Sequence, residues 1–154
     1  RGRGAAPLLD AVGDATGTSE PFEGYPAGTR AAQLKETSVA SAFLDAFGRP
    51  ARHTTCECER SFEPSVGQAL LLLNSPIVQN KLGAAGGRVR KLIERKASHA
   101  QIVEELTLAT LGRFPTADEI RKGTEWLAAA KDPVVGAEDL LWALLNAKEF
   151  VFNR

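Results

Sequence analysis

The chain has 154 residues, enough for one domain with its own core, and its 44% apolar and 25% charged residues are typical of a folded globular protein. Its 19 basic and 19 acidic side chains cancel, which argues against a nucleic-acid partner. No apolar run reaches the roughly 18 residues that cross a bilayer, so direct membrane insertion is not expected. Because the chain starts at Arg1 and contains no methionine, we expect it to be part of a longer or processed polypeptide.

The first 37 residues predict a helix and an irregular loop that pack on the core. The helix is expected to start near Pro7, a residue that suits the first helical turn, and to end at Gly17. Prolines, glycines and aromatic residues make Thr18–Gly28 a loop, and Thr29–Leu34 is expected to be extended. The apolar face of the helix comprises Leu8, Leu9 and Val12, and the loop is expected to be pinned by Phe22 and Tyr25.

Residues 38–154 read as a series of short helices separated by turns. Ser98 is expected to cap one helix that ends at Gly112, and Thr116 with Glu119 forms a capping box for the next. The expected helices cover residues 38–47, 64–73, 76–82, 88–97, 98–112, 116–130, and a last one that starts after Asp132-Pro133. The chain is therefore predicted to be all-α, a compact bundle of about six to eight short helices with little or no β structure. Residues 1–37 and 38–154 are expected to form one structural unit.

Apolar residues at three- and four-residue spacing predict which helix faces are buried. The stripe of helix 98–112 comprises Ile102, Val103, Leu106 and Ala109, and that of helix 116–130 comprises Ile120, Gly123, Leu127 and Ala130. The last helix is expected to be largely buried through Leu140, Leu141, Leu144, Leu145, Trp142 and Phe150. Packing in the core is the expected role of Trp126 and Trp142.

His53, Cys56 and Cys58 form the closest grouping of soft metal ligands. A closed zinc site needs about four ligands, and the other imidazole belongs to His99, so the spacing fits zinc poorly. A disulfide between Cys56 and Cys58 is a second possibility, because a turn at Glu57 can bring their α-carbons within bonding range. Its ring would be small, strained and easily reduced.

The interpretation that we favour is two free cysteines packed beside the apolar helix 64–73. Glu57, Glu59 and Arg60 would then form ion pairs around them. A nucleophilic cysteine is disfavoured because flanking carboxylates favour the thiol over the thiolate.

A basic cluster lies on the expected helix 88–97, formed by Arg88, Arg90, Lys91, Arg95 and Lys96. It is either a solvated helix face or a surface for an acidic partner. With Arg60, the residues Arg88, Arg90 and Lys91 are candidate interaction residues. The chain contains no phosphate-binding loop, no Gly-x-Ser-x-Gly elbow and no His-Glu-x-x-His helix, so no catalytic residue is assigned.

From about Pro7 onward, the ordered segments FLDAFGRP, TCECERS, EPSVGQALLLLNSP, LTLATLGRFPTADEI and LLWALLNAKEFVFN resemble a known family. It is the C-terminal domain of unknown function of planctomycete-type, cytochrome-c-associated (PSD-type) exported proteins. Cys58 followed by Arg60 matches the general family pattern, and Cys56 belongs to a subset with a Cys-x-Cys motif. The resemblance implies an extracytoplasmic setting, periplasmic or at the cell surface. It also implies haem elsewhere in the parent chain, because this segment lacks a Cys-x-x-Cys-His motif and is expected to hold no cofactor.

These observations favour a non-catalytic helical interaction or assembly module at the C-terminal end of a larger exported multidomain protein. Its partners are expected to be other domains of the parent chain or a separate protein. The alternative is a redox or metal accessory site built on His53, Cys56 and Cys58 and linked to a cytochrome-like domain elsewhere in that parent chain.

Overall fold

A computed structural model describes residues 5–34 and 73–152. Within these two ranges the chain forms seven α-helices and one short 3₁₀ helix, and no strand. The predicted all-α bundle is therefore confirmed. The expected helices 38–47 and 64–73 fall outside the described residues, apart from Leu73 at the end of the second.

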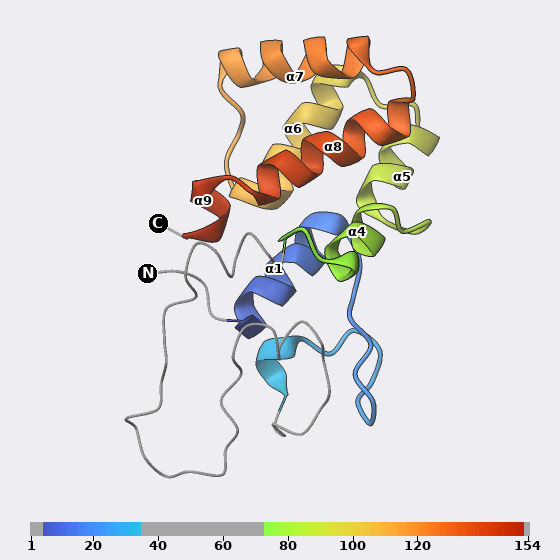
Figure 1. Ribbon diagram of the computed structural model, residues 1–154, viewed down its shortest axis with the longest axis vertical. Helices are drawn as coiled ribbons and strands as arrows, with labels where there is room; N and C mark the ends of the chain where they lie inside the picture. Colours follow the sequence, from blue (N-terminus) through green and yellow to red (C-terminus); the bar gives the residue numbers. More distant parts are fainter. Residues whose placement is uncertain (1–4, 35–72, 153–154) are drawn as a thin grey trace.

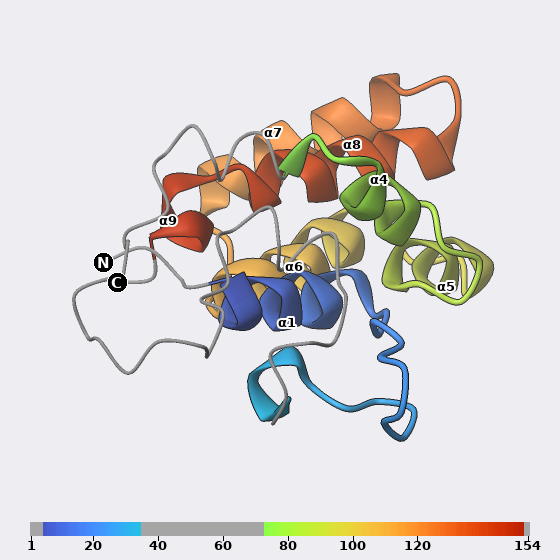
Figure 2. The same cartoon turned by 60° about the horizontal axis from the view of Figure 1, so that its bottom comes forward.

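Helix α1 (Ala5–Thr16) forms as the sequence predicts and ends directly before Gly17. Leu8, Leu9 and Val12 are all buried. They pack α1 along α6 (His99–Leu111), which lies much later in the chain, and Figure 2 shows the two helices side by side. The core is thus built from both ends of the sequence.

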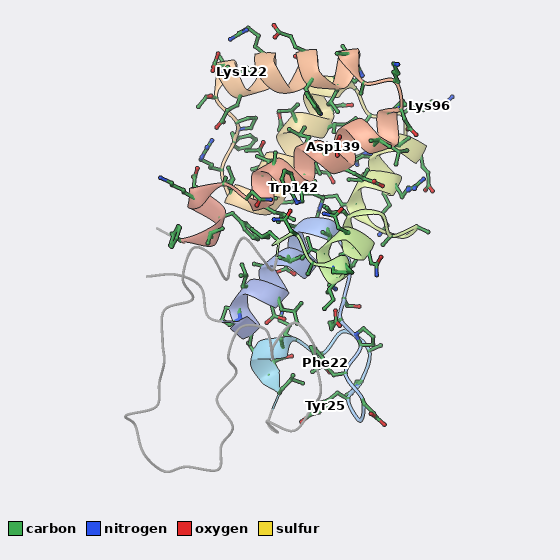
Figure 3. The ribbon with its side chains drawn as sticks, in the orientation of Figure 1. Phe22, Tyr25, Lys96, Lys122, Asp139 and Trp142 are labelled. Atoms are coloured by element: carbon green, nitrogen blue, oxygen red, sulfur yellow. The ribbon has the colours of Figure 1, made fainter. Side chains whose placement is uncertain are left out.

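Residues 18–28 form the predicted loop, and its two aromatic side chains hold it against the helices. Phe22 is buried and Tyr25 is half-buried against the core (Figure 3). The loop also supplies Glu20, whose carboxylate pairs with the buried ammonium of Lys81.

The prediction of an extended segment over Thr29–Leu34 is wrong, because Ala31–Gln33 forms the 3₁₀ helix η1. Asp10 on α1 accepts hydrogen bonds from the backbone N–H of Ala31 at 2.7 Å and of Ala32 at 3.1 Å. The carboxylate satisfies two amides at the start of the turn that would otherwise lack partners. A tight turn is thereby favoured over an extended segment.

Helices α4 (Pro76–Leu82) and α5 (Arg88–Glu94) follow, with the glycine-rich break between them that the sequence predicts. The hydroxyl of Ser75 caps α4 by accepting from the N–H of Val78. Helix α5 ends earlier than the expected residue 97, because Lys96 has a φ of 55° and cannot continue it. Its buried residues are Val89 and Leu92, and Ile93 is half-buried.

Helices α6 and α7 (Ala117–Ala129) begin at the predicted caps, Ser98 and Thr116. Thr116 forms the predicted capping box with Glu119, and Ser98 forms a further box with Gln101. Gly112 ends α6 with a φ of 67°, a left-handed conformation that glycine adopts without steric cost. Gly123 on α7 faces Val103 on α6 so closely that a Cβ atom at position 123 would lie 2.6 Å from Val103 Cγ2. The missing side chain lets the two helices approach.

The expected last helix is two helices, α8 (Pro133–Leu145) and α9 (Lys148–Val151). The break comes at Asn146, whose side-chain amide donates to the carbonyl oxygen of Trp142 at 2.8 Å, and at the extended Ala147. The prediction that this segment is largely buried holds for only one face. Buried residues there are Leu141, Leu145 and Phe150, whereas Leu140, Trp142 and Leu144 are half-buried.

The helices enclose one apolar core to which all seven α-helices contribute. In Figure 1, α7 runs along the top, α8 crosses in front of α6, and α1 lies below. The largest fully buried side chains are Leu8, Val12, Leu73, Val78, Val89, Leu92, Leu106, Leu141, Leu145 and Phe150.

Arg113, directly after α6, connects three helices at one end of the bundle. Its guanidinium donates to Glu119 on α7 and to Glu149 on α9, with distances of 2.8–3.0 Å.

Candidate interaction surface

The predicted grouping of His53, Cys56 and Cys58 lies outside the described residues, as does the candidate interaction residue Arg60. The metal and disulfide hypotheses therefore stay predictions. Among residues 5–34 and 73–152, no three His, Cys, Asp or Glu side chains converge on a position for a metal ion. In the same part of the chain, no helix has both the length and the apolar character to cross a membrane.

Arg88, predicted to lie on a solvated face or on a surface for an acidic partner, instead forms hydrogen bonds to α1 and α6. Its Nε donates to the carbonyl oxygen of Ala15 at 2.9 Å and its Nη2 to that of Asp14 at 2.8 Å. These carbonyls belong to the last turn of α1, where they have no partner within the helix and where a cation is favoured. A third bond, from Nη1, reaches Glu105 on α6 at 3.3 Å.

The other members of the basic cluster differ from one another in their contacts. Arg90 lies 3.9 Å from Glu138 on α8, and Arg95 pairs with Glu105. Lys91 and Lys96 are both exposed, and neither side chain forms a hydrogen bond or ion pair with any described residue. The five basic side chains therefore do not act as one surface, and Lys91 is the candidate interaction residue among them that faces solvent unpaired.

Large apolar side chains are exposed instead along α7 and α8. Trp126 on α7 is 52% exposed and Val135 on α8 is 49% exposed, although the sequence predicted Trp126 to lie in the core. Half-buried Leu140 and Trp142 continue the patch along α8. We call this the α7–α8 surface, and define it by Trp126, Val135, Asp139, Leu140 and Trp142.

The position of Trp126 follows from the two residues that α7 buries. Gly123 and Leu127 lie four apart and face α6 and α8, which puts Trp126, about 100° around the helix, on the flank. The indole N–H then donates to the carbonyl oxygen of Gly136 in α8 at 3.1 Å. The ring is thus held at one edge while much of its surface remains open to solvent.

Trp142 is anchored in the same manner. Its indole N–H donates to the carbonyl oxygen of Leu73 at 3.2 Å, so its polar edge points into the molecule. Figure 3 shows Trp142 and Asp139 on α8, the helix that crosses in front of α6. Both tryptophans therefore offer fixed ring surface rather than mobile side chains.

Two shallow hollows flank Trp126 on this surface. The first, of about 330 Å³, extends over the turn from α7 to α8, and the second, of about 320 Å³, extends along α8. Trp126 and Asp139 line both hollows. The first is completed by Ala129, Ala130, Lys131, Asp132, Val135 and Gly136, and the second by Leu140, Trp142 and Ala143.

Carboxylates dominate the charge at this surface. Asp139 forms no hydrogen bond or ion pair with any described residue, and Asp132 lies on the rim of the first hollow beside Lys131. Next along α8, burial raises the pKa of Glu138 above its ordinary value; Arg90 opposes this shift, while Asp132 and Asp139 reinforce it. Asp132 and Asp139 therefore act on Glu138 as nearby negative charges, and Arg90 acts as a positive one.

This surface was not predicted from the sequence, although one signal for it was present. The predicted stripe of Ile120, Gly123, Leu127 and Ala130 already completes the inward face of α7, and Trp126 is not part of it. A tryptophan next to a complete stripe lies at the border of the buried face. At that position the pattern is equally compatible with an exposed and with a buried side chain.

The structure therefore defines an all-α domain that presents a rigid aromatic surface with an unpaired carboxylate. The family model described as "PSD1: Protein of unknown function (DUF1553)" matches residues 27–127. This is about two thirds of the sequence, and the chain belongs to that family. The match includes Trp126, whereas Asp139 and Trp142 lie after it. No curated protein and no solved structure matches the chain.

Proposed function

We propose that this chain is a non-catalytic helical interaction module that contacts another domain of its parent chain or a separate protein through the α7–α8 surface. The observation that carries the proposal is the exposed, hydrogen-bonded ring of Trp126. Exposing a large aromatic surface to water is unfavourable, and tryptophan is enriched at the centres of protein interfaces. Because the ring is already fixed by Gly136, a partner would bury it at little conformational cost.

Oxidative surface labelling read by mass spectrometry tests this proposal. The 154-residue chain is labelled once in purified form and once inside the cells that produce it naturally. We expect oxidation of Trp126 to fall severalfold in the cells, because a bound partner shields the ring. Phe114, which is 68% exposed and lies at the other end of α7, serves as the internal control. Equal protection of both residues, or of neither, would contradict the proposal.

The setting that we propose rests on the resemblance of the whole sequence rather than on the fold. We propose that the module is the C-terminal end of a larger exported protein of planctomycete type, with a cytochrome-c-like domain elsewhere in that protein. Membership of a family of unknown function is compatible with this setting. We expect protease added to intact cells to remove the domain. We also expect the full-length protein to show a haem absorbance band. A protease-resistant domain and a haem-free parent protein would overturn it.

A second candidate function comes from the sequence alone. His53, Cys56 and Cys58 bring together both cysteines and one of the two histidines of the chain, a composition suited to a redox or metal accessory site. Titrating thiols with and without reductant, with metal analysis of the same sample, tests this candidate. Two thiols that titrate freely without reductant, and no bound metal, would eliminate it.

A further inference from the structure

The second hollow of the α7–α8 surface combines two features that attract the same kind of group. Trp126 and Trp142 both line it, and the faces of indole rings carry negative electrostatic potential. Asp139 lines it as well, with a carboxylate that no described residue neutralises. Aromatic faces and a carboxylate each favour a cation over a neutral or acidic group.

The surroundings strengthen this preference. Lys131, the one basic side chain among the residues that line the two hollows, is at the first hollow and does not line the second. Burial raises the pKa of Glu138 and Arg90 lowers it, while Asp132 and Asp139 raise it further, so both aspartates act as negative charges close to this part of α8. A positive group from outside would offset the negative charge of Asp139 at the second hollow.

The same charges argue against a second copy of this chain as the occupant. A symmetric dimer uses the same surface on both copies, so residues at the centre of the surface meet their own counterparts. Asp139 lines both hollows and is therefore central. A symmetric contact would bring two unpaired carboxylates together with loss of their solvation, which is unfavourable.

We propose that the hollow between Trp126 and Trp142 binds a Lys or Arg side chain of a partner protein segment, and that a large apolar side chain of the same segment occupies the hollow at Val135. The inference rests on the proposed function, which it refines by naming the chemistry of the partner. The aliphatic part of the cation would lie along the indole rings while its charged end reaches Asp139.

Selection from a displayed library of random short peptides tests the chemistry of the partner. The library is selected on the unaltered chain and, in parallel, on Trp126→Ala and Phe114→Ala. We expect peptides that are enriched on the unaltered chain and on Phe114→Ala, but not on Trp126→Ala, to combine Lys or Arg with a nearby large apolar residue. Circular dichroism checks that each variant is folded, and Trp126→Phe, which keeps an aromatic ring, should retain part of the binding.

A double-mutant cycle then tests the contact with Asp139. The probe is the most enriched peptide and its counterpart in which the basic residue is replaced by Gln. We expect Asp139→Asn to weaken the binding of the basic peptide by about threefold to tenfold at low salt, and by less at high salt. The Gln peptide should be insensitive to this substitution. Glu104→Gln, which removes an exposed carboxylate of α6 that forms no ion pair with the described residues, is the matched control.

The possible outcomes separate the two proposals. If no peptide distinguishes the unaltered chain from Trp126→Ala, the interaction surface and the inference both fail. If the enriched peptides are neutral or acidic, or if Asp139→Asn has no more effect than Glu104→Gln, the surface stands and the cation-binding hollow is wrong. Dimerisation that is abolished by Trp126→Ala would also overturn the inference, because it would identify a second copy as the occupant.

Discussion

The ammonium of Lys81 lies 3.1 Å from a carboxylate oxygen of Glu20, although the Lys81 side chain is only 8% exposed. Thr18 Oγ1 accepts a further, longer hydrogen bond from the same nitrogen, at 3.4 Å. A buried lysine needs such partners, since an unpaired ammonium away from water is strongly destabilised. The pair therefore fastens the loop of residues 18–28 to helix α4.

We predict that Glu20→Gln lowers the free energy of unfolding by about 1–3 kcal/mol, because it leaves the buried ammonium without a compensating charge. Denaturation in urea, followed by circular dichroism, measures the change. Glu23→Gln is the matched control: it lies in the same loop, is exposed, and should change stability by less than about 0.5 kcal/mol. Equal effects of the two substitutions would show that the ion pair contributes nothing.

Arg88 should matter to stability and Lys91 should not, although the two lie on one short helix. Arg88→Lys keeps the charge but cannot reach Asp14, Ala15 and Glu105 together, so we expect a loss of about 1–2 kcal/mol in the free energy of unfolding. Lys91→Met should be nearly neutral in the same denaturation experiment. A stability loss for Lys91→Met as large as that for Arg88→Lys would contradict the division of the basic cluster.

Gly123→Ala should destabilise the protein even though alanine is the better helix former. The added methyl group would overlap Val103, whose Cγ2, Cγ1 and Cβ atoms would all lie within 3.4 Å, so rotating that side chain does not clear the space. We expect a net loss of about 1–2 kcal/mol in the free energy of unfolding, because overpacking costs more than the better helix propensity of alanine contributes.

The overlap at Gly123 also predicts a rescue. The Gly123→Ala, Val103→Ala double variant should lose no stability relative to Val103→Ala alone, because the smaller side chain at position 103 leaves space for the methyl group at position 123. The free energy of unfolding is the quantity compared. Gly86→Ala, where a Cβ atom would meet no neighbour within 4 Å, serves as the tolerant control. Additive losses in the double variant would exclude the steric explanation.

The ion pairs of Arg113 predict a specific dependence of stability on pH. Hydrogen bonds from the Arg113 guanidinium, and then from the backbone of Thr116, lower the pKa of Glu119 from 4.5 to about 2. A carboxylate with a lower pKa in the folded state stabilises the fold above pH 4.5, and this contribution is lost as the pH falls towards 2.

Glu119→Gln isolates this effect, because glutamine can keep the capping-box hydrogen bond but not the charge. Near neutral pH the variant should be less stable by under about 1 kcal/mol, a small value because the Glu119 side chain is 40% exposed. The difference from the unaltered chain should vanish as the pH approaches 2. A difference that stays constant from neutral to acidic pH would show that the charge of Glu119 is not involved.

Features that depend on neighbours in the sequence were predicted correctly. Ser98, Gly112 and Thr116 start and end helices through bonds within a few residues, and the structure places those boundaries where the sequence indicates. The buried positions of α1 and α6 follow for the same reason, because a repeat of three and four residues fixes a helix face. Ala109, predicted to be buried, is half-buried in the structure.

Features that depend on distant residues were missed. The segment Ala31–Gln33 became a 3₁₀ helix because of Asp10, and Arg88 turned inward because the end of α1 lies beside it. The exposure of Trp126 depends on how α7 packs against α6 and α8, which periodicity does not determine. The candidate surface therefore required the tertiary arrangement, while the bundle class did not.

The docking of α1 on α6 has a practical consequence for dissecting the polypeptide. A truncated version that starts at residue 38 would lose α1 and leave the apolar sides of α4, α5 and α6 open to water. Such a fragment should aggregate or unfold rather than report on binding. Recombinant work on the α7–α8 surface therefore has to retain residues 5–34, even though they contribute none of its side chains.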